Sequence, residues 1–215
     1  MKTISKITLA LLPLAFFASS MAQAADTKFY GGIKLGDSYT MTKYDYKLEW
    51  MGEKAHADET FKKSVFSVNP FVGVDFQYNS LLGQRVELEG FFHGKAKSEV
   101  KGDRVEVQSN GFFVNTYLDF HVNKVVAPYV GLGIGYAHNK IDQSFDELDN
   151  SKDSVAAQIG GGVLFNVTDN LGIDLNVRYA CYGDYETKTS GYDFKAERDV
   201  TLGAVEFLAG VKYTF

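Results

Sequence analysis

The side chains best suited to catalysis or metal binding are few and scattered along the chain. The four histidines and the single cysteine are His56, His93, His121, His138 and Cys181. A zinc site needs closely spaced His or Cys ligands, and the sequence has no H-x-x-x-H or comparable cluster. The acidic stretch FDELDNSKD lacks the spacing and central glycine of an EF-hand loop. The sequence therefore predicts no metal, no cofactor and no residue that binds one.

Charged residues follow a more regular pattern, because ten of them fall on one side of strand-like segments. Successive side chains of a strand point to opposite faces, so each charge lies opposite an apolar neighbour. Four cations and six anions share the charged face, and mixed signs allow ion pairing in a buried setting. The ten are Lys34, Asp75, Arg85, Glu87, Glu89, Asp119, Asp174, Arg178, Glu206 and Lys212.

Eight segments of alternating or strand-rich composition must position these charges. They are 28–36, 65–78, 84–94, 111–122, 128–138, 155–167, 171–181 and 206–215. Segment 65–78 alternates most clearly, although Pro70 cannot donate to a ladder and predicts a bulge there. The connections are long and short in turn, which is typical of a meander with two different ends. We expect long loops at about 38–63, 95–109, 139–153 and 183–199.

The uncharged face of each segment indicates contact with lipid. The chain after residue 24 has no run of 18 apolar residues, so it predicts no transmembrane helix. Only helices and closed barrels satisfy their backbone groups in lipid. The predicted fold is therefore all-β, an eight-stranded antiparallel up-and-down transmembrane β-barrel over residues 25–215. Side chains fill the interior of a barrel of this size. The charges should fill the lumen, with Lys212 meeting Glu206, Asp174 or an acidic residue of another strand.

Aromatic residues at both ends of the segments predict two membrane-interface girdles, since Tyr and Trp favour that interface. Those near the short turns are Tyr78, Phe120, Phe165, Tyr213 and Phe215. Those near the long connections are Phe66, Phe92, Phe112, Tyr136 and Tyr179.

The N-terminal residues 1–24 have the composition of a cleaved secretory signal peptide. Lys2 and Lys6 precede the apolar stretch 7–17, and the small residues Ala22 and Ala24 frame a cleavage site. One cysteine cannot form an internal disulfide in the exported chain. The formal charge is −5 and no basic stripe is visible, so we expect no nucleic-acid partner.

Three stretches resemble a known family, and the resemblance covers essentially the whole chain after the signal peptide. PYVGLGIGYAH (128–138), DNLGIDLNVRYA (169–180) and GVKYTF (210–215) are similar to small bacterial outer-membrane β-barrel proteins. That group includes the opacity-type porins and the transmembrane domain of the OmpA-like family. The resemblance implies location in the bacterial outer membrane, among its lipids and lipopolysaccharide. It also implies that Tyr213 and Phe215, in the last strand, signal insertion to the outer-membrane assembly machinery.

Fold alone does not select among the functions of such barrels. We expect a non-enzymatic protein with a filled lumen that supports envelope integrity or surface recognition, as adhesins and surface antigens do. Tyr44, Tyr46 and Trp50 are candidate loop contacts for a host or environmental ligand.

Three alternatives remain at this point. A narrow porin-like channel for small solutes or ions is permitted by the charged lumen. A lipid-A-modifying enzyme is less favoured, because the resembled deacylases carry a His-x-Ser pair and this chain has none. A soluble lipocalin-like barrel would also have a signal peptide and eight strands, but the uncharged outer faces oppose it. We therefore predict no catalytic residue.

Overall fold

The computed structural model describes residues 26–50, 53–100, 103–143, 150–190 and 194–215, and these form β-strands throughout most of their length. No helix in this part of the chain is long and apolar enough to cross a membrane. The strands are β1 (Asp26–Trp50), β2 (Glu53–Gln77), β3 (Leu82–His93), β4 (Ala96–Val100), β5 (Asp103–Phe120), β6 (Val126–Gln143), β7 (Asn150–Asn166), β8 (Leu171–Ser190) and β9 (Phe194–Thr214).

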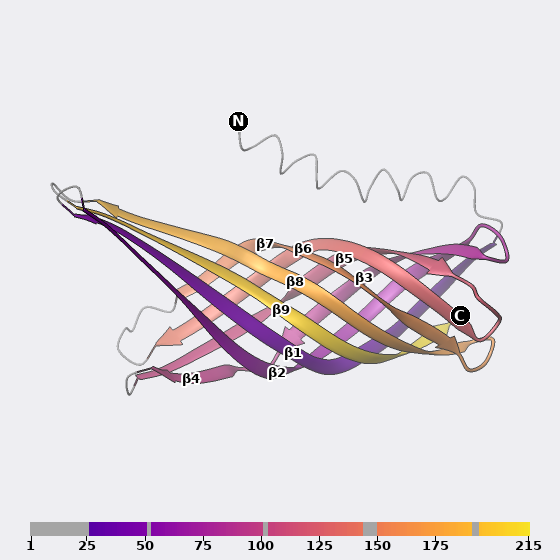
Figure 1. Ribbon diagram of the computed structural model, residues 1–215. Helices are drawn as coiled ribbons and strands as arrows, with labels where there is room; N and C mark the ends of the chain where they lie inside the picture. The colour runs from indigo at the N-terminus through magenta and orange to yellow at the C-terminus, as the bar shows by residue number, and fades with distance from the viewer. Residues whose placement is uncertain (1–25, 51–52, 101–102, 144–149, 191–193) are drawn as a thin grey trace.

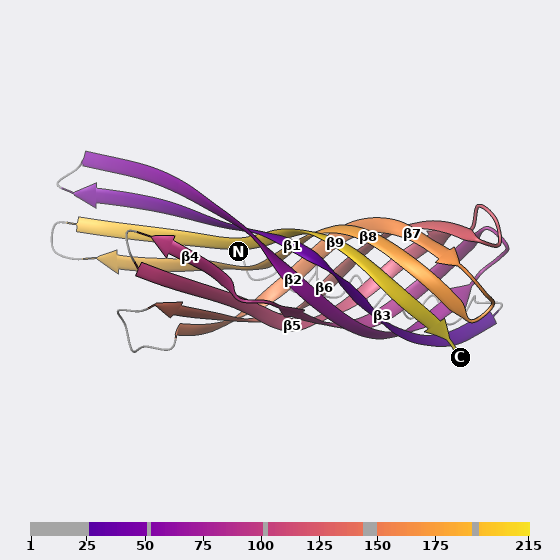
Figure 2. The same ribbon diagram turned by 90° about the horizontal axis from the view of Figure 1, so that it is seen from below.

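These strands close into one antiparallel barrel (Figures 1 and 2). Neighbours in the sheet follow the order β3-β2-β1-β9-β8-β7-β6-β5, and pairing of β3 with β5 closes the ring. β4 pairs with the outer part of β5, so it continues the line of β3 after an interruption at Gly94 and Lys95. The wall is therefore eight strands around, and the predicted fold class is confirmed.

Short turns connect the strands at one end of the barrel, and a side chain braces each of them. Asn79 Oδ1 accepts the backbone N–H groups of Leu81 and Leu82 at 2.8 Å. Asn123 Oδ1 accepts two backbone N–H groups in the same way at the turn that leads into β6, and the Thr168 hydroxyl does so at the turn that leads into β8. Such local bonds from Asn and Thr stabilise tight turns, which accounts for the three short connections in the sequence.

The opposite end differs from the sequence prediction, because the expected loops are mostly long hairpins. β1 and β2 remain in register from Asp26 with Gln77 to Trp50 with Glu53. Segment 38–63 is therefore largely strand rather than loop. Segment 183–199 is likewise mostly hairpin, formed by the outer parts of β8 and β9. The physical reason is that β9 also pairs with β1 as far as Phe194 with Trp50, so the strands support one another beyond the barrel.

The barrel wall opens where these hairpins begin. The β7–β8 ladder ends at Ala157 with Cys181, and the β8–β9 register shifts between Cys181 and Gly183. Gly183 has a φ of 130°, a conformation that favours glycine, so it permits the shift. Beyond it β2, β1, β9 and β8 project together as a four-stranded sheet, visible on the left of Figure 2.

Pro70 does not produce the expected bulge. The β2–β3 register is the same before and after it, from Val68 with Phe92 to Phe71 with Glu89. The ladder omits the pairs in between, because proline has no N–H to donate. The exposed ring of Pro70 fits on the outside of the wall without bending it.

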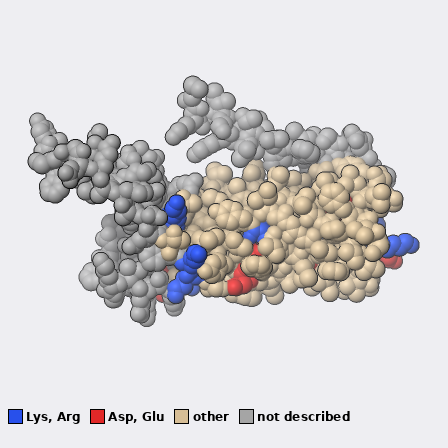
Figure 3. Space-filling model, in the orientation of Figure 1, with Lys and Arg blue, Asp and Glu red and all other residues tan. Residues whose placement is uncertain are grey.

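The outer wall is apolar over the height of the barrel. Val130, Leu132, Ile159, Val177 and Phe207 are examples of outward side chains that are between 47% and 65% exposed. In Figure 3 most of the visible barrel side has neither Lys, Arg, Asp nor Glu. The predicted girdle residues Phe66, Phe92, Phe112, Tyr136 and Tyr179 are exposed toward the hairpin end, and Phe120, Tyr213 and Phe215 toward the short turns. This surface is the one that a barrel presents to lipid.

Candidate functional site

The lumen contains all ten charged residues that the sequence pattern singles out. Each of them is buried, with Asp75 the most exposed at 9%. They come from β1, β2, β3, β5, β8 and β9, and alternation along those strands turns them inward. Isolated charges are costly to bury, so their partners decide whether this interior is stable.

Lys34 forms the first group at the centre of the lumen. Its ammonium lies 2.6 Å from Glu87 Oε1 and 2.7 Å from Glu89 Oε2. Both carboxylates come from β3, where residues two apart share a face. Glu87 also accepts hydrogen bonds from the hydroxyls of Tyr30, at 3.2 Å, and Tyr117, at 3.3 Å. One cation thus bridges two like charges that would otherwise repel.

Arg178 joins this group to the hairpin end of the lumen. Its Nη1 lies 2.5 Å from Glu89 Oε1, and its Nε lies 2.5 Å from Glu206 Oε2. Glu206 also accepts a hydrogen bond from the hydroxyl of Ser38, at 2.9 Å. Glu89 also accepts a hydrogen bond from Asn69 at 2.9 Å. Lys34, Glu89, Arg178 and Glu206 therefore form one continuous chain of ion pairs between β1, β3, β8 and β9.

Two further pairs lie nearer the short turns. Arg85 donates to both carboxylate oxygens of Asp119, at 2.8 and 2.9 Å. Such bidentate pairs are among the strongest that side chains form. Lys212 meets Asp75 of β2 at 2.9 Å, which is the acidic residue of another strand rather than Glu206 or Asp174.

Asp174 is the remaining carboxylate among the ten charged residues, and it pairs with a neutral side chain. It accepts a 2.6 Å hydrogen bond from the hydroxyl of Tyr129, which in turn accepts from Asn176 at 3.0 Å. The Arg85 guanidinium lies 4.6 Å from the centre of the Tyr129 ring. Aromatic residues thus link Asp174 to the neighbouring cation.

Inward glycines on β6 and β7 make room for these large side chains. A Cβ on Gly131 would lie 2.2 Å from the Tyr117 ring, and one on Gly160 would lie 2.5 Å from Arg178 Cβ. The wall therefore has no side chain at the positions that face these large lumen residues.

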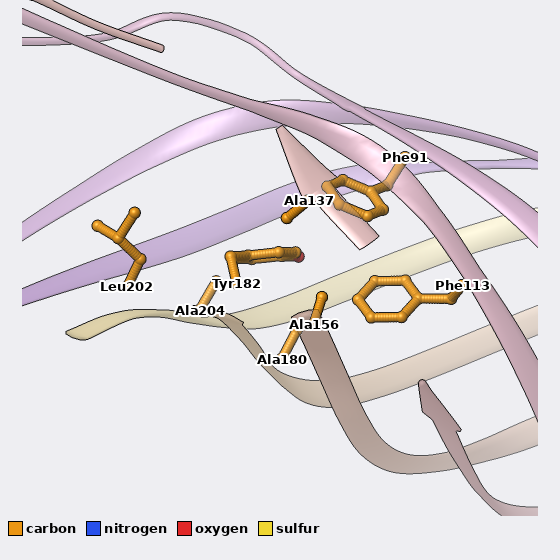
Figure 4. Packing of buried hydrophobic residues seen from close by; sticks show 8 residues of the cluster. All are labelled: Phe91, Phe113, Ala137, Ala156, Ala180, Tyr182, Leu202 and Ala204. Atoms are coloured by element: carbon orange, nitrogen blue, oxygen red, sulfur yellow. The ribbon is translucent and has the colours of Figure 1, made fainter. Parts of the chain in front are cut away.

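An aromatic cluster lies inside the barrel toward the hairpin end, above the ion pairs. Phe91 packs against Phe113 and Tyr182 with ring centres 4.9 and 5.0 Å apart. The buried cluster is Phe91, Phe113, Ala137, Ala156, Ala180, Tyr182, Leu202 and Ala204 (Figure 4). The small alanines of the wall leave space for the three rings.

His93 connects this aromatic cluster to the ion pairs. Its Nε2 lies 2.8 Å from Glu206 Oε1, and the Tyr182 hydroxyl donates to the same oxygen. Sequence reasoning considered His93 only as a possible zinc ligand and assigned it no role in the lumen. It passed over Tyr182, which falls just beyond the last expected residue of its strand. Continued alternation from Arg178 through Ala180 was the available signal for Tyr182.

Two further predicted residues lie on the outer surface of the wall. Tyr213 and Phe215 face outward at the short-turn end, where the Phe215 N–H donates to Phe29 O at 2.9 Å. Tyr44, Tyr46 and Trp50 occupy the projecting part of β1, and their side chains lie outside the described residues. The predicted signal peptide, residues 1–24, also lies outside them.

Among the described residues no group of three or more His, Cys, Asp and Glu side chains could hold a metal ion. The lumen contains paired charges and packed rings. Their ion pairs stabilise the membrane-spanning wall electrostatically.

A closed wall with an apolar exterior and an ion-paired interior defines an integral outer-membrane β-barrel. The chain belongs to the outer membrane protein beta-barrel domain family, whose model matches residues 8–215. It is 28% identical over 177 residues to outer membrane protein PagN of Salmonella typhimurium. The matched region covers 71% of this chain and 74% of that protein. Its location is accordingly the bacterial outer membrane, as the sequence predicts.

Several solved structures have a fold similar to that of this chain. OprG from Pseudomonas aeruginosa matches with a TM-score of 0.50 and 14% identity, over 86% of this chain and 96% of that chain. Ail of Yersinia pestis, in complex with the heparin analogue sucrose octasulfate, matches with a TM-score of 0.40 and 18% identity, over 82% of this chain and 99% of that chain. The likeness to OprG supports the fold alone.

Proposed function

We propose that this protein is a non-enzymatic outer-membrane barrel that holds a sealed lumen and presents its projecting hairpins for surface recognition. The observation that carries the proposal is the division of the chain into two regions. Paired charges and packed rings fill the inside of the wall, while β1, β2, β8 and β9 continue beyond it as a sheet. A filled lumen supports a rigid anchor, and an extended sheet provides the surface for contacts outside the cell.

The ion pairs supply the rigidity in this proposal. Residues of β3 and β8 lie on separate parts of the wall, and the Arg178–Glu89 contact joins them directly across the lumen. Such a cross-brace opposes changes in the barrel's cross-section. A stable anchor of this kind contributes to envelope integrity, in contact with outer-membrane lipids and lipopolysaccharide.

Surface recognition is tested by removing the projecting sheet and leaving the wall. A variant that joins residue 42 to residue 61 through a short turn shortens the β1–β2 hairpin, and a matched variant shortens the β4–β5 hairpin instead. Cells producing each variant are compared for adhesion to immobilised host matrix and to abiotic surfaces. We expect loss of adhesion only when the β1–β2 hairpin is shortened. Equal adhesion by both variants, with both folded by heat-modifiable gel mobility, would refute the recognition role.

A narrow channel is the second candidate, and unpaired lumen atoms favour it. Arg178 Nη2, Gln158 Oε1 and Asn176 Oδ1 are buried without a hydrogen-bond partner among the described residues. Polar groups of this kind are satisfied by water, so part of the lumen is suited to hydration. The aromatic cluster around Phe91 opposes continuous passage. Planar-bilayer recordings decide between the two: a sealed lumen gives no resolved steps, whereas a channel gives steps that change in Arg178→Ala.

A further inference from the structure

A polar cluster lies on the outside of the wall, immediately beyond the apolar band. Alternation on β6 turns Ala137 and Asn139 inward, so Tyr136, His138 and Lys140 form an outward stripe. Register places Asn110 of β5 beside His138 on one side and Asp153 of β7 on the other. Three adjacent strands thus bring polar side chains together at the hairpin end of the outer surface.

The cluster is ordered by short contacts rather than freely solvated. His138 Nδ1 lies 2.6 Å from Asp153 Oδ1, and the two side chains remain 39% and 57% exposed. Hydrogen bonds from His138 and from Tyr136 hold the pKa of Asp153 below its ordinary value. The bond at Nδ1 fixes the imidazole ring and leaves Nε2 directed away from this carboxylate. Asp153 therefore positions His138 for another partner.

One polar atom of the cluster lacks a partner. Asn110 Oδ1 is buried and has no hydrogen-bond partner among the described residues. An unsatisfied buried acceptor is uncommon and indicates a missing donor such as a hydroxyl group. It lies next to His138 in the register, so the same ligand could reach both.

An aromatic shelf borders the cluster. Phe112 and Tyr136 are stacked with ring centres 6.2 Å apart, and Phe92 of β3 lies opposite Asn110 in the register. All three are at least 40% exposed. Flat apolar rings beneath a polar group suit an amphipathic ligand whose chains enter the membrane.

We propose that Asn110, His138 and Lys140, above the shelf of Phe92, Phe112 and Tyr136, bind the phosphorylated sugar headgroup of an outer-leaflet glycolipid. The phosphate contacts Lys140, the cation of the stripe, and accepts from His138 Nε2 when the imidazole carries a proton on both nitrogens. A sugar hydroxyl donates to Asn110 Oδ1, and Asp153 stays on the far side of the imidazole, away from the phosphate. The acyl chains lie against the aromatic shelf. This site is separate from the projecting sheet and does not depend on its role in recognition.

The test measures lipid retention by the full-length mature protein, refolded into phosphatidylcholine nanodiscs. Bis-phosphorylated lipid A is added, and native mass spectrometry follows its binding. Loss of one charge-assisted contact corresponds to about a tenfold weaker affinity. We expect that decrease in His138→Ala and in Lys140→Ala, and a similar decrease when wild type is given dephosphorylated lipid A.

Lys43→Ala provides the matched control, because it removes an exposed rim cation from β1 on another part of the wall. Its affinity should equal that of wild type. Equal losses in Lys43→Ala and Lys140→Ala would overturn the site, since they would indicate attraction by overall charge. Unchanged binding in both cluster variants would overturn it as well. Tighter binding of phosphatidylglycerol at matched charge would overturn the assignment to a glycolipid. Lys140 is exposed, so its variant carries the test if His138→Ala fails to fold.

Discussion

Arg178 on β8 reaches across the lumen to Glu89 on β3, where its Nη1 lies 2.5 Å from Oε1. The same guanidinium holds Glu206 of the adjacent strand through Nε. One side chain therefore pairs with two buried carboxylates from separate parts of the wall.

Replacing Arg178 by Ala should strongly destabilise the barrel, because Glu89 and Glu206 would both lose a buried counter-charge. Removing one partner of a buried pair costs about 3–5 kcal/mol. The free energy of unfolding in lipid vesicles, from urea titration followed by gel mobility, measures the effect. Lys62→Ala, which removes an exposed cation at the rim, should change that energy by no more than about 0.5 kcal/mol. A similar value for both variants would mean that the network does not stabilise the wall.

Lys212 and Asp75 should be energetically coupled, since their charged atoms lie 2.9 Å apart and both are largely buried. A double-mutant cycle with Lys212→Gln and Asp75→Asn isolates the pair from its surroundings. We expect a coupling energy of about 0.5–3 kcal/mol. Lys212→Gln combined with Asp119→Asn is the comparison, because Asp119 is paired with Arg85 and should couple more weakly. Additive effects within the first pair would show that the contact contributes no net stability.

The alternation in the sequence was sufficient to predict the fold, and the ten charges that it places on one face are buried in the structure. It could not predict which charges meet, because partners such as Arg178 and Glu89 are joined across the lumen rather than along a ladder. It also missed the hairpins beyond the barrel. Segment 38–63 has a polar composition that resembles a loop, yet its backbone is paired on both sides of β1. Tyr182 was missed because the expected strand stopped at Cys181, where the register shifts.

The inward glycines should be far less replaceable than outward ones. A Cβ at Gly131 would lie 2.2 Å from the Tyr117 ring, so Gly131→Ala must displace a ring that contacts Glu87. Overpacking of this kind costs about 1–3 kcal/mol. Gly31→Ala is the control, since its Cβ meets nothing closer than 3.4 Å. Urea titration of the two variants measures the difference, and equal stabilities would contradict the packing described for the lumen.

Charge on the outer wall should be tolerated according to depth. Leu132 lies within the apolar stretch of β6, and Leu132→Arg should cost about 2–4 kcal/mol in a bilayer. Val122 lies beside a short turn, and the same substitution there should cost no more than about 1 kcal/mol. Spin labels at both positions provide a second measurement, with contact to acyl chains expected only at Leu132. A label at Leu132 that is accessible to a water-soluble relaxant would contradict the assignment of this face to lipid.

The final aromatic residue should matter for assembly in the cell more than for the folded barrel. Phe215 is 77% exposed, and its backbone N–H donates a hydrogen bond to the carbonyl oxygen of Phe29. Phe215→Ala therefore keeps that bond and should leave the free energy of unfolding of the refolded protein nearly unchanged. If Tyr213 and Phe215 signal insertion, the same variant should lower the folded amount in the outer membrane severalfold, measured by heat-modifiable mobility of cell envelopes. Phe120→Ala provides the control, because it removes an exposed girdle ring from an internal strand. A comparable decrease in both variants would attribute the effect to the loss of an interface aromatic, and would exclude a signal specific to the last strand.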